Sequence, residues 1–221
     1  MADDPKAGLE LLKKAKEDGH GDKKAVSRPS FPYDDDGCIP SDTIADILAK
    51  PNLTEANDLA MTRIEENIQK LQSETGLTDE DIFRVPALYW TRVWECSESD
   101  SGNSKTNDEG IREELDHVKA ALDGQKNLIR RQQQDPNRIL AIALYPGIIN
   151  GLMLPDKYVV APNPWGPSID GVDILAEAAT QAYEQAGVNL NFVDNWFSQH
   201  VDGGGVHCGS NSWRNTNGQW W

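Results

Sequence analysis

Residues 157–194 read KYVVAPNPWGPSIDGVDILAEAATQAYEQAGVNLNFVD, and their pattern indicates the fold class more directly than any other stretch. The apolar run KYVVAP is typical of a buried strand, and the Pro- and Gly-rich NPWGPSIDG after it is typical of a turn. An alanine-rich amphipathic helix is predicted over 174–186, where Gly187 stops it. VNLNFVD then alternates apolar and polar residues, as a strand does. Strand, helix and strand in this order predict an α/β architecture.

Elements upstream of this stretch extend the α/β prediction. Residues 139–154, ILAIALYPGIINGLML, are short apolar runs broken by Pro and Gly, and they predict buried strands. Apolar residues spaced three and four apart predict a long helix over 54–75 and a shorter one over 6–17. Residues 84–90, RVPALYW, are predicted to be extended or turned, because the residue before a proline avoids the helical region. Residues 27–42 are rich in Pro, Gly and Asp and predict a loop.

Residues 95–137 form a separate polar segment. Its first part, ECSESDSGNSKTND, is low in complexity, and its last part, RRQQQDPN, is polar throughout. Between these parts, apolar residues on one face predict a helix over 111–131. We expect 95–137 to be a surface insertion that carries no chemistry.

The charge and the cysteines limit the function classes. The 221 residues carry a formal net charge of -15, which argues against nucleic acid or an anionic membrane as a partner. No apolar run is as long as a membrane span, and the acidic start MADDPKAGLELL does not resemble a signal peptide. The three cysteines, Cys38, Cys96 and Cys208, suit no disulfide framework and form no CxxC pair for zinc. We therefore expect the chain in a reducing compartment, the cytoplasm.

The cysteine of the loop HVDGGGVHCGSNSWR, residues 200–214, is a candidate nucleophile. Cysteine attacks as the thiolate, and glycines such as Gly204 and Gly205 let the backbone approach a ligand closely. The amide of Asn211 is able to hydrogen-bond a polar substrate. The alternative is that Cys208 is a small buried hydrophobic residue and that the glycines form a flexible turn.

The histidines of this loop allow two further interpretations. His200 and Asp202 are spaced as a His-x-Asp pair, which on one face of an extended segment would act as an acid-base unit. His207 directly precedes Cys208, so on a strand its side chain faces the other way, and it is predicted to be a poor general base. A metal site from His200, His207 and Cys208 is disfavoured for the same reason.

Several motifs together resemble the protein-arginine deiminase family. GGVHCGSN, residues 204–211, is similar to the nucleophile motif of that family, Gly-Glu-Val-His-Cys-Gly-Thr-Asn. NFVDNWFSQH resembles the segment before that motif, and APNPWGPSIDG resembles the family's Pro-Phe-Gly-Pro turn. DEDIFRVPALYW, DGHGD and the terminal pair Trp220 and Trp221 also have counterparts in the family. The cysteine motif alone is shared with agmatine deiminases, and the other matches favour protein-arginine deiminase.

The resemblance implies a fold and a chemistry. The fold is the pentein α/β propeller, of which this chain would hold the last ββαβ modules together with added helices. Cys208 would attack the guanidinium carbon of peptidyl arginine, two carboxylates would bind the guanidinium nitrogens, and a histidine would protonate the departing ammonia. The product would be citrulline. The resemblance also implies calcium dependence, although no calcium ligand is identifiable in this sequence.

The resemblance further indicates what this chain lacks. The His-x-Asp-Glu segment of the family lies upstream of the part that matches Met1, so His200 and Asp202 align beside the cysteine and are discarded as the catalytic pair. Gly205 stands where the family has Glu. We therefore expect residues 1–221 to be the C-terminal part of a protein-arginine deiminase-like catalytic domain, and to be inactive in isolation.

Cys208 is thus the predicted catalytic residue, and Gly204, Gly205 and Asn211 are the predicted substrate-binding residues. The expected partner is an arginine-containing protein substrate, and we also expect self-association through exposed strand edges. Three alternatives stay open. They are an agmatine-deiminase-like enzyme that acts on free guanidines, a non-catalytic fold remnant that serves as an interaction module, and another cysteine hydrolase that uses His200 or His207.

Overall fold

The structure is a computed structural model that describes residues 1–30, 39–91 and 141–211. The insertion predicted over 95–137, with its helix, lies outside the described residues, as do Cys38, Cys96 and the two terminal tryptophans. The helices of the described part are α1 (Pro5–Ala15), α2 (Ile44–Leu48), α3 (Leu53–Thr75) and α5 (Ile174–Gln185). Its strands are β1 (Ala2–Asp4), β2 (Arg84–Pro86), β3 (Tyr89–Trp90), β4 (Ile142–Ala143), β5 (Leu152–Leu154), β6 (Tyr158–Pro162), β7 (Ser168–Ile169), β8 (Val172–Asp173) and β9 (Asn189–Val193).

The three helices predicted within the described residues are confirmed as α1, α3 and α5, and they differ from the prediction only at their ends. The side chain of Asp4 begins α1 by accepting the N–H of Ala7 at 2.9 Å. Asp173 begins α5 in the same way, because its carboxylate accepts the N–H groups of the first helical turn. Gly76 ends α3 with a φ of 75°, a conformation that glycine adopts without strain.

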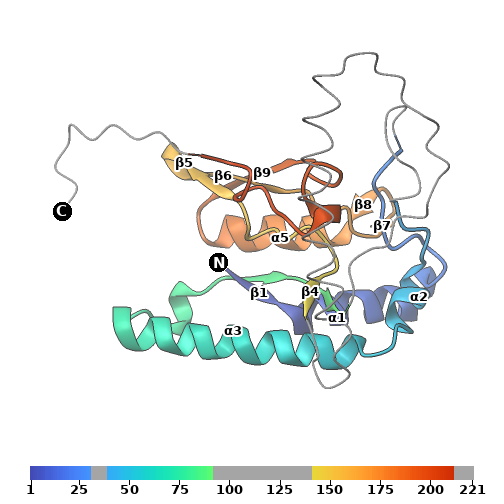
Figure 1. Cartoon of the computed structure of the whole chain (residues 1–221), viewed down its shortest axis with the longest axis horizontal. Helices are drawn as coiled ribbons and strands as arrows, with labels where there is room; N and C mark the ends of the chain where they lie inside the picture. Colours follow the sequence, from blue (N-terminus) through green and yellow to red (C-terminus); the bar gives the residue numbers. More distant parts are fainter. Residues whose placement is uncertain (31–38, 92–140, 212–221) are drawn as a thin grey trace, which may run out of the picture.

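The strands predicted from KYVVAP and VNLNFVD are confirmed as β6 and β9, which pair in parallel. The helix α5 connects them, because parallel neighbours need a crossover connection. The strand β5 pairs antiparallel with β6, so the sheet has the order β5-β6-β9. Figure 1 shows α5 between this sheet and a second layer that contains β1 and α3. The architecture is α/β, as predicted, and no sheet of the described residues closes on itself.

The other sheets of the described part are small pairs. The strand β1 pairs in parallel with β2, while β3 with β4 and β7 with β8 are antiparallel. The elements β1, α2, β7 and β8 were not predicted, because segments of two to five residues are too short to show a period.

One prediction about the strands is wrong in part. Residues 139–154 were expected to form buried strands, but Met153 is 57% exposed and Leu154 is 40% exposed. The reason is topological, since β5 is an edge strand with a neighbour on one side only. Apolar side chains at such an edge stay in contact with solvent even though their sequence pattern resembles that of a core strand.

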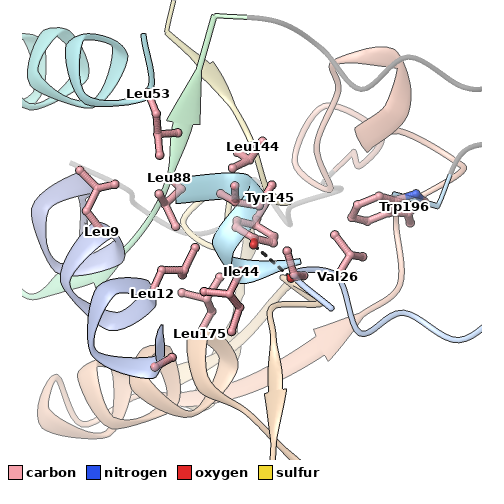
Figure 2. Close-up of a cluster of buried hydrophobic side chains, with 13 residues drawn as sticks. Leu9, Leu12, Val26, Ile44, Leu53, Leu88, Leu144, Tyr145, Leu175 and Trp196 are labelled. Carbon is pink, nitrogen blue, oxygen red and sulfur yellow. Dashed lines mark hydrogen bonds between the residues drawn. The ribbon is translucent and has the colours of Figure 1, made fainter. Parts of the chain in front are cut away.

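The main hydrophobic core joins the four helices (Figure 2). Its buried members are Leu9, Leu12, Ala15, Ala25, Val26, Ile44, Ile47, Leu53, Leu88, Leu144, Tyr145, Leu175 and Trp196. The Tyr145 hydroxyl donates a hydrogen bond of 3.0 Å to the carbonyl of Ala25, which Figure 2 draws as a dashed line. A second cluster, with Val159, Ala161 and Tyr183 among its members, packs α5 against β6. Leu144 follows β4 directly, and Trp196 precedes the C-terminal loop, so the core fixes the two segments that form the candidate site.

Candidate active site

A pocket of about 170 Å³ lies where β4, the residues after it and the C-terminal loop come together. The described residues that line it are Ile142, Ala143, Gly147, Asn150, His200, Gly203, Gly204, Gly205 and Cys208. Of the predicted site residues, Cys208, Gly204 and Gly205 are therefore brought together at one pocket. Asn211 is exposed and does not belong to this lining.

Cys208 lies in a tight turn at the pocket. Its thiol is free, and the residue is exposed, which contradicts the alternative of a buried structural cysteine. The carbonyl of Gly205 accepts the N–H of Cys208 at 3.1 Å and the N–H of Gly209 at 3.3 Å. The turn closes further through Ser210, whose N–H donates to the carbonyl of His207 at 3.1 Å. These bonds fix the backbone of the turn that carries Cys208 in an otherwise glycine-rich loop.

Asn150 joins this turn to the residues after β4. Its Oδ1 accepts the N–H of His207 at 2.9 Å, and its Nδ2 lies 4.0 Å from the sulfur of Cys208. An N–H donor beside sulfur interacts more strongly with a thiolate than with a thiol. Sequence reasoning missed Asn150. The only signal was a polar residue between an apolar run and Gly151, which by itself indicates no more than a turn.

Gly205 is buried beneath the turn, and the side chain of Asn150 occupies the space next to it. A Cβ atom at position 205 would lie 2.5 Å from Oδ1 of Asn150, which is closer than real Cβ contacts. A side chain at this position would displace the amide that holds the N–H of His207. Gly205, which stands where the related motif has Glu, is therefore coupled to Asn150, because a side chain at position 205 would overlap the Asn150 amide.

His200 begins the 3-10 turn His200–Asp202 and is only 8% exposed. Its ring packs against Trp196 with the two ring centroids 4.9 Å apart. Burial lowers the pKa of His200 to about 4, although a hydrogen bond with the backbone of Leu144 opposes the shift. The imidazole is consequently neutral at pH 7. The structure thus places His200 at the Cys208 pocket, although the pair of His200 and Asp202 was discarded as catalytic on the sequence.

Asp202 and His207, the neighbouring candidate residues, lie outside the pocket lining. Asp202 is half-buried and does not line the pocket, so the structure does not present His200 and Asp202 as one acid-base pair at the cysteine. His207 is exposed and also lies outside the lining. His207 was predicted to face away from Cys208 on a strand, but residues 206–209 form a turn, so the alternation of side chains along a strand does not apply here.

An ion pair supports the segment that leads to the loop. Arg28 donates from Nε and Nη2 to the carboxylate of Asp194, with a shortest distance of 2.8 Å. The guanidinium also lies over the ring of Phe197, 4.5 Å from its centroid. Asp194 additionally accepts the indole N–H of Trp165 at 3.0 Å. Residues 194–197 are therefore held from two sides before the chain reaches His200.

The described residues contain neither a metal-ligand cluster nor a membrane-spanning helix. No group of three or more His, Cys, Asp or Glu side chains gathers there in a way that could hold a metal ion. No helix of the described part is both long enough and apolar enough to cross a membrane.

The fold and the site together define an α/β chain with an exposed cysteine on a glycine turn at the rim of a pocket. The chain belongs to the protein-arginine deiminase family, whose sequence model matches residues 1–221. It is 26% identical to protein-arginine deiminase type-4 of Rattus norvegicus over 218 residues, which cover 98% of this chain and 25% of that protein. The identity to type-4 of Mus musculus is 26% over 221 residues, again 98% of this chain and 25% of the relative. Human protein-arginine deiminase type-1 is 25% identical over 207 residues, 94% of this chain and 23% of that protein. The chain thus spans about a quarter of the length of these relatives.

Proposed function

We propose that this chain carries the nucleophile of a protein-arginine deiminase-type reaction and that Cys208 is that nucleophile. The observation that carries the proposal is the exposed sulfur of Cys208 at the 170 Å³ pocket, on a turn that Asn150 holds in place. Gly204 and Gly205 would shape the loop around the substrate, and Asn211 would bind the substrate from outside the pocket lining. Membership in the family supports arginine-containing proteins as substrates.

The proposed reaction has two stages. The thiolate of Cys208 forms a bond to the guanidinium carbon, the bond from that carbon to one terminal nitrogen breaks, and this nitrogen leaves as ammonia after it takes up a proton. Water then adds to the carbon of the thiouronium intermediate, and the carbon–sulfur bond breaks. Citrulline is released and the thiolate is restored. The amide N–H of Asn150 would stabilise the thiolate at the start and the end of this cycle.

The pocket of the described residues is incomplete for this chemistry. None of the nine lining residues is a carboxylate, whereas a planar cation binds best to bidentate carboxylates. The described residues also offer no cluster that fits calcium, so no proposed step uses that ion. We expect slow turnover by the isolated chain, because loss of acid-base assistance alone costs on the order of 10² to 10⁴ in rate.

We further propose that the connection β5-β6-α5-β9 is one ββαβ module of a pentein-type propeller. The order of these elements and the parallel pairing of β6 with β9 support this interpretation. In this proposal residues 1–221 are the C-terminal part of the catalytic domain, with 95–137 inserted in it. The exposed apolar side chains of β5 also support self-association through the free edge, which light scattering of the purified chain at several concentrations would detect.

Alkylation of Cys208 tests the proposed nucleophile. Iodoacetamide at neutral pH should label Cys208 faster than it labels free cysteine, and an arginine-based amidine should slow this labelling. Peptide mass spectrometry separates Cys208 from Cys38 and Cys96, and the Cys208→Ser variant is the control. Slow labelling that ignores the amidine would instead support a non-catalytic interaction module.

Product analysis then distinguishes the possible substrates. Citrulline formed in an arginine-containing peptide supports the protein deiminase, while activity on a free alkylguanidine alone supports an agmatine-deiminase-like enzyme. Hydrolysis of an ester or amide would support a different cysteine hydrolase if it requires Cys208 together with one of the two histidines, His200 or His207.

A further inference from the structure

His200 is the one side chain of the Cys208 pocket with a buried polar atom that has no hydrogen-bond partner among the described residues. The atom is Nε2, and the residue is only 8% exposed. Buried polar groups nearly always have a partner, so an exception that lines a pocket needs an explanation. His200 lines the pocket, which is large enough for several waters or a small planar group, so a group bound there would lie against the His200 ring.

The hydrogen bond of the other ring nitrogen defines what Nε2 can do. The imidazole bonds to the backbone of Leu144, and because Nε2 has no partner, this bond must use Nδ1. The bond favours the protonated nitrogen, so the backbone carbonyl is the acceptor and Nδ1 carries the hydrogen. Burial keeps the ring neutral at pH 7 by lowering its pKa to about 4. Nε2 therefore presents a lone pair and accepts, but does not donate, a hydrogen bond.

Asn150 is another polar side chain of the pocket lining, and unlike Nε2 of His200 it offers a hydrogen-bond donor. Asn150 directs its Nδ2, a donor, toward the sulfur of Cys208 at 4.0 Å. Trp196 packs against the His200 ring and restricts its rotation. The pocket thus combines a fixed acceptor, a donor at the nucleophile and otherwise apolar or glycine surface. A ligand that matches it offers an N–H group to His200.

We propose that Nε2 of His200 accepts a hydrogen bond from an N–H of the guanidinium group that Cys208 attacks, and that His200 thereby selects guanidines over ureas and amides. The inference rests on the proposed function, because it concerns the same pocket. A carbonyl oxygen in place of this N–H would face a lone pair and bind less well. A neutral imidazole supplies orientation and selectivity here, and it does not replace the charge of a carboxylate.

A matched pair of alkylating probes measures this selectivity. Chloroacetamidine and chloroacetamide share their carbon skeleton and leaving group, but the amidine has an N–H group where the amide has a carbonyl. The rate of labelling at Cys208 by each probe is divided by its rate with free cysteine, which removes intrinsic reactivity. The wild-type chain should then prefer the amidine. His200→Leu should lower this preference about tenfold, the usual effect of one buried hydrogen bond, while His200→Gln, which keeps an acceptor, should retain most of it.

The outcomes separate the two proposals. If the wild-type chain prefers the amidine and His200→Leu keeps that preference, the role of His200 is wrong and the proposed function stands. If the wild-type chain does not prefer the amidine over the amide, both the role of His200 and the proposed function are wrong. Circular dichroism of each variant shows whether it is folded.

A second measurement needs no variant at the histidine. In the long-range ¹H–¹⁵N spectrum of the Cys208→Ser chain, methylguanidinium should shift the Nε2 signal of His200 in a saturable way. Tetramethylammonium, a cation without an N–H group, should leave this signal in place. An unchanged signal with methylguanidinium, or equal shifts with both cations, would overturn the inference even if His200→Leu does not fold.

Discussion

Arg28 and Asp194 form an ion pair in which Nη2 of Arg28 lies 2.8 Å from Oδ2 of Asp194, although 166 positions separate the two residues. The guanidinium is almost fully buried, with 4% of its side chain exposed, while 36% of the Asp194 side chain is exposed. The pair fastens the segment around Arg28 to the residues that follow β9 and lead to His200 and Cys208. The geometry of the pocket therefore depends on a contact outside it.

Replacing Arg28 by Met should lower the free energy of unfolding by about 2–3 kcal/mol, less than the cost of breaking a fully buried pair because Asp194 is partly exposed. Urea denaturation measures this. Arg63→Met is the matched control, since Arg63 pairs with Glu66 at the surface and should cost less than about 1 kcal/mol. Equal costs for the two variants would contradict the structural role of Arg28.

The same pair has a defined pH dependence. Burial by itself would raise the pKa of Asp194, but the bonds from Arg28 and from two tryptophan N–H groups lower it below its usual value. A depressed carboxyl pKa gives stability that is present above the unfolded value of 3.8 and is lost as the pH falls through the folded value. The cost of Arg28→Met should therefore shrink at the acid end of the titration.

Asn150 should control the reactivity of Cys208 through its amide nitrogen. Asn150→Asp keeps an oxygen for the N–H of His207 but replaces the donor near sulfur by a negative oxygen. Alkylation of Cys208 at neutral pH should become about tenfold slower, which corresponds to about 1.4 kcal/mol against the thiolate. Asn163→Asp, which makes the same change in a turn away from the pocket, should leave the rate unchanged. If both variants slow the reaction equally, overall charge and not the local contact is responsible.

Gly205→Ala should destabilise the Cys208 turn by about 1–3 kcal/mol, because the new methyl group would overlap the amide of Asn150. Hydrogen exchange at the N–H of His207, which that amide holds, should become faster. Gly204→Ala is the control, since its Cβ would meet the carbonyl oxygen of Gln199 at 3.3 Å, a milder contact. Adding Asn150→Gly to Gly205→Ala should remove the steric part of the cost, and a strictly additive double variant would argue against the coupling.

His200 should make the folded chain sensitive to mild acid. Its pKa is about 4 in the folded state because of burial, against 6.5 for an unperturbed histidine. Between these values the unfolded chain binds more protons, so the free energy of unfolding falls as the pH falls from 6.5 to 4. The difference in stability between the wild-type chain and His200→Gln should change by on the order of 3 kcal/mol across this window. Desolvation raises the carboxyl pKa of Asp3 and of Asp173, but both groups titrate in both chains, so their contributions cancel in the difference. A constant difference would show that His200 is not buried in solution.

Local sequence patterns predicted much of the fold. The helices α1, α3 and α5 and the strands β6 and β9 were predictable, because their apolar periods and their stop signals, such as Gly76 and Gly187, lie within each segment. The cysteine turn was also recognisable, since Gly204, Gly205 and Cys208 are adjacent in the chain. The exposure of β5 was not predictable, because it depends on which strands flank it in the sheet and not on its own residues.

The composition of the pocket depended on packing between distant segments. Asn150 reaches Cys208 across 58 positions of sequence, and no local pattern connects the two. His200 resembled a loop residue in the sequence, yet it packs against the core residue Trp196, bonds to the backbone of Leu144 and lines the Cys208 pocket with a buried Nε2. Short-range periodicity and turn chemistry depend on neighbouring residues, and they predicted the position of the Cys208 loop after the last strand. Burial, steric fit at Gly205 and the protonation of His200 arise only when segments far apart in the chain exclude water from one another.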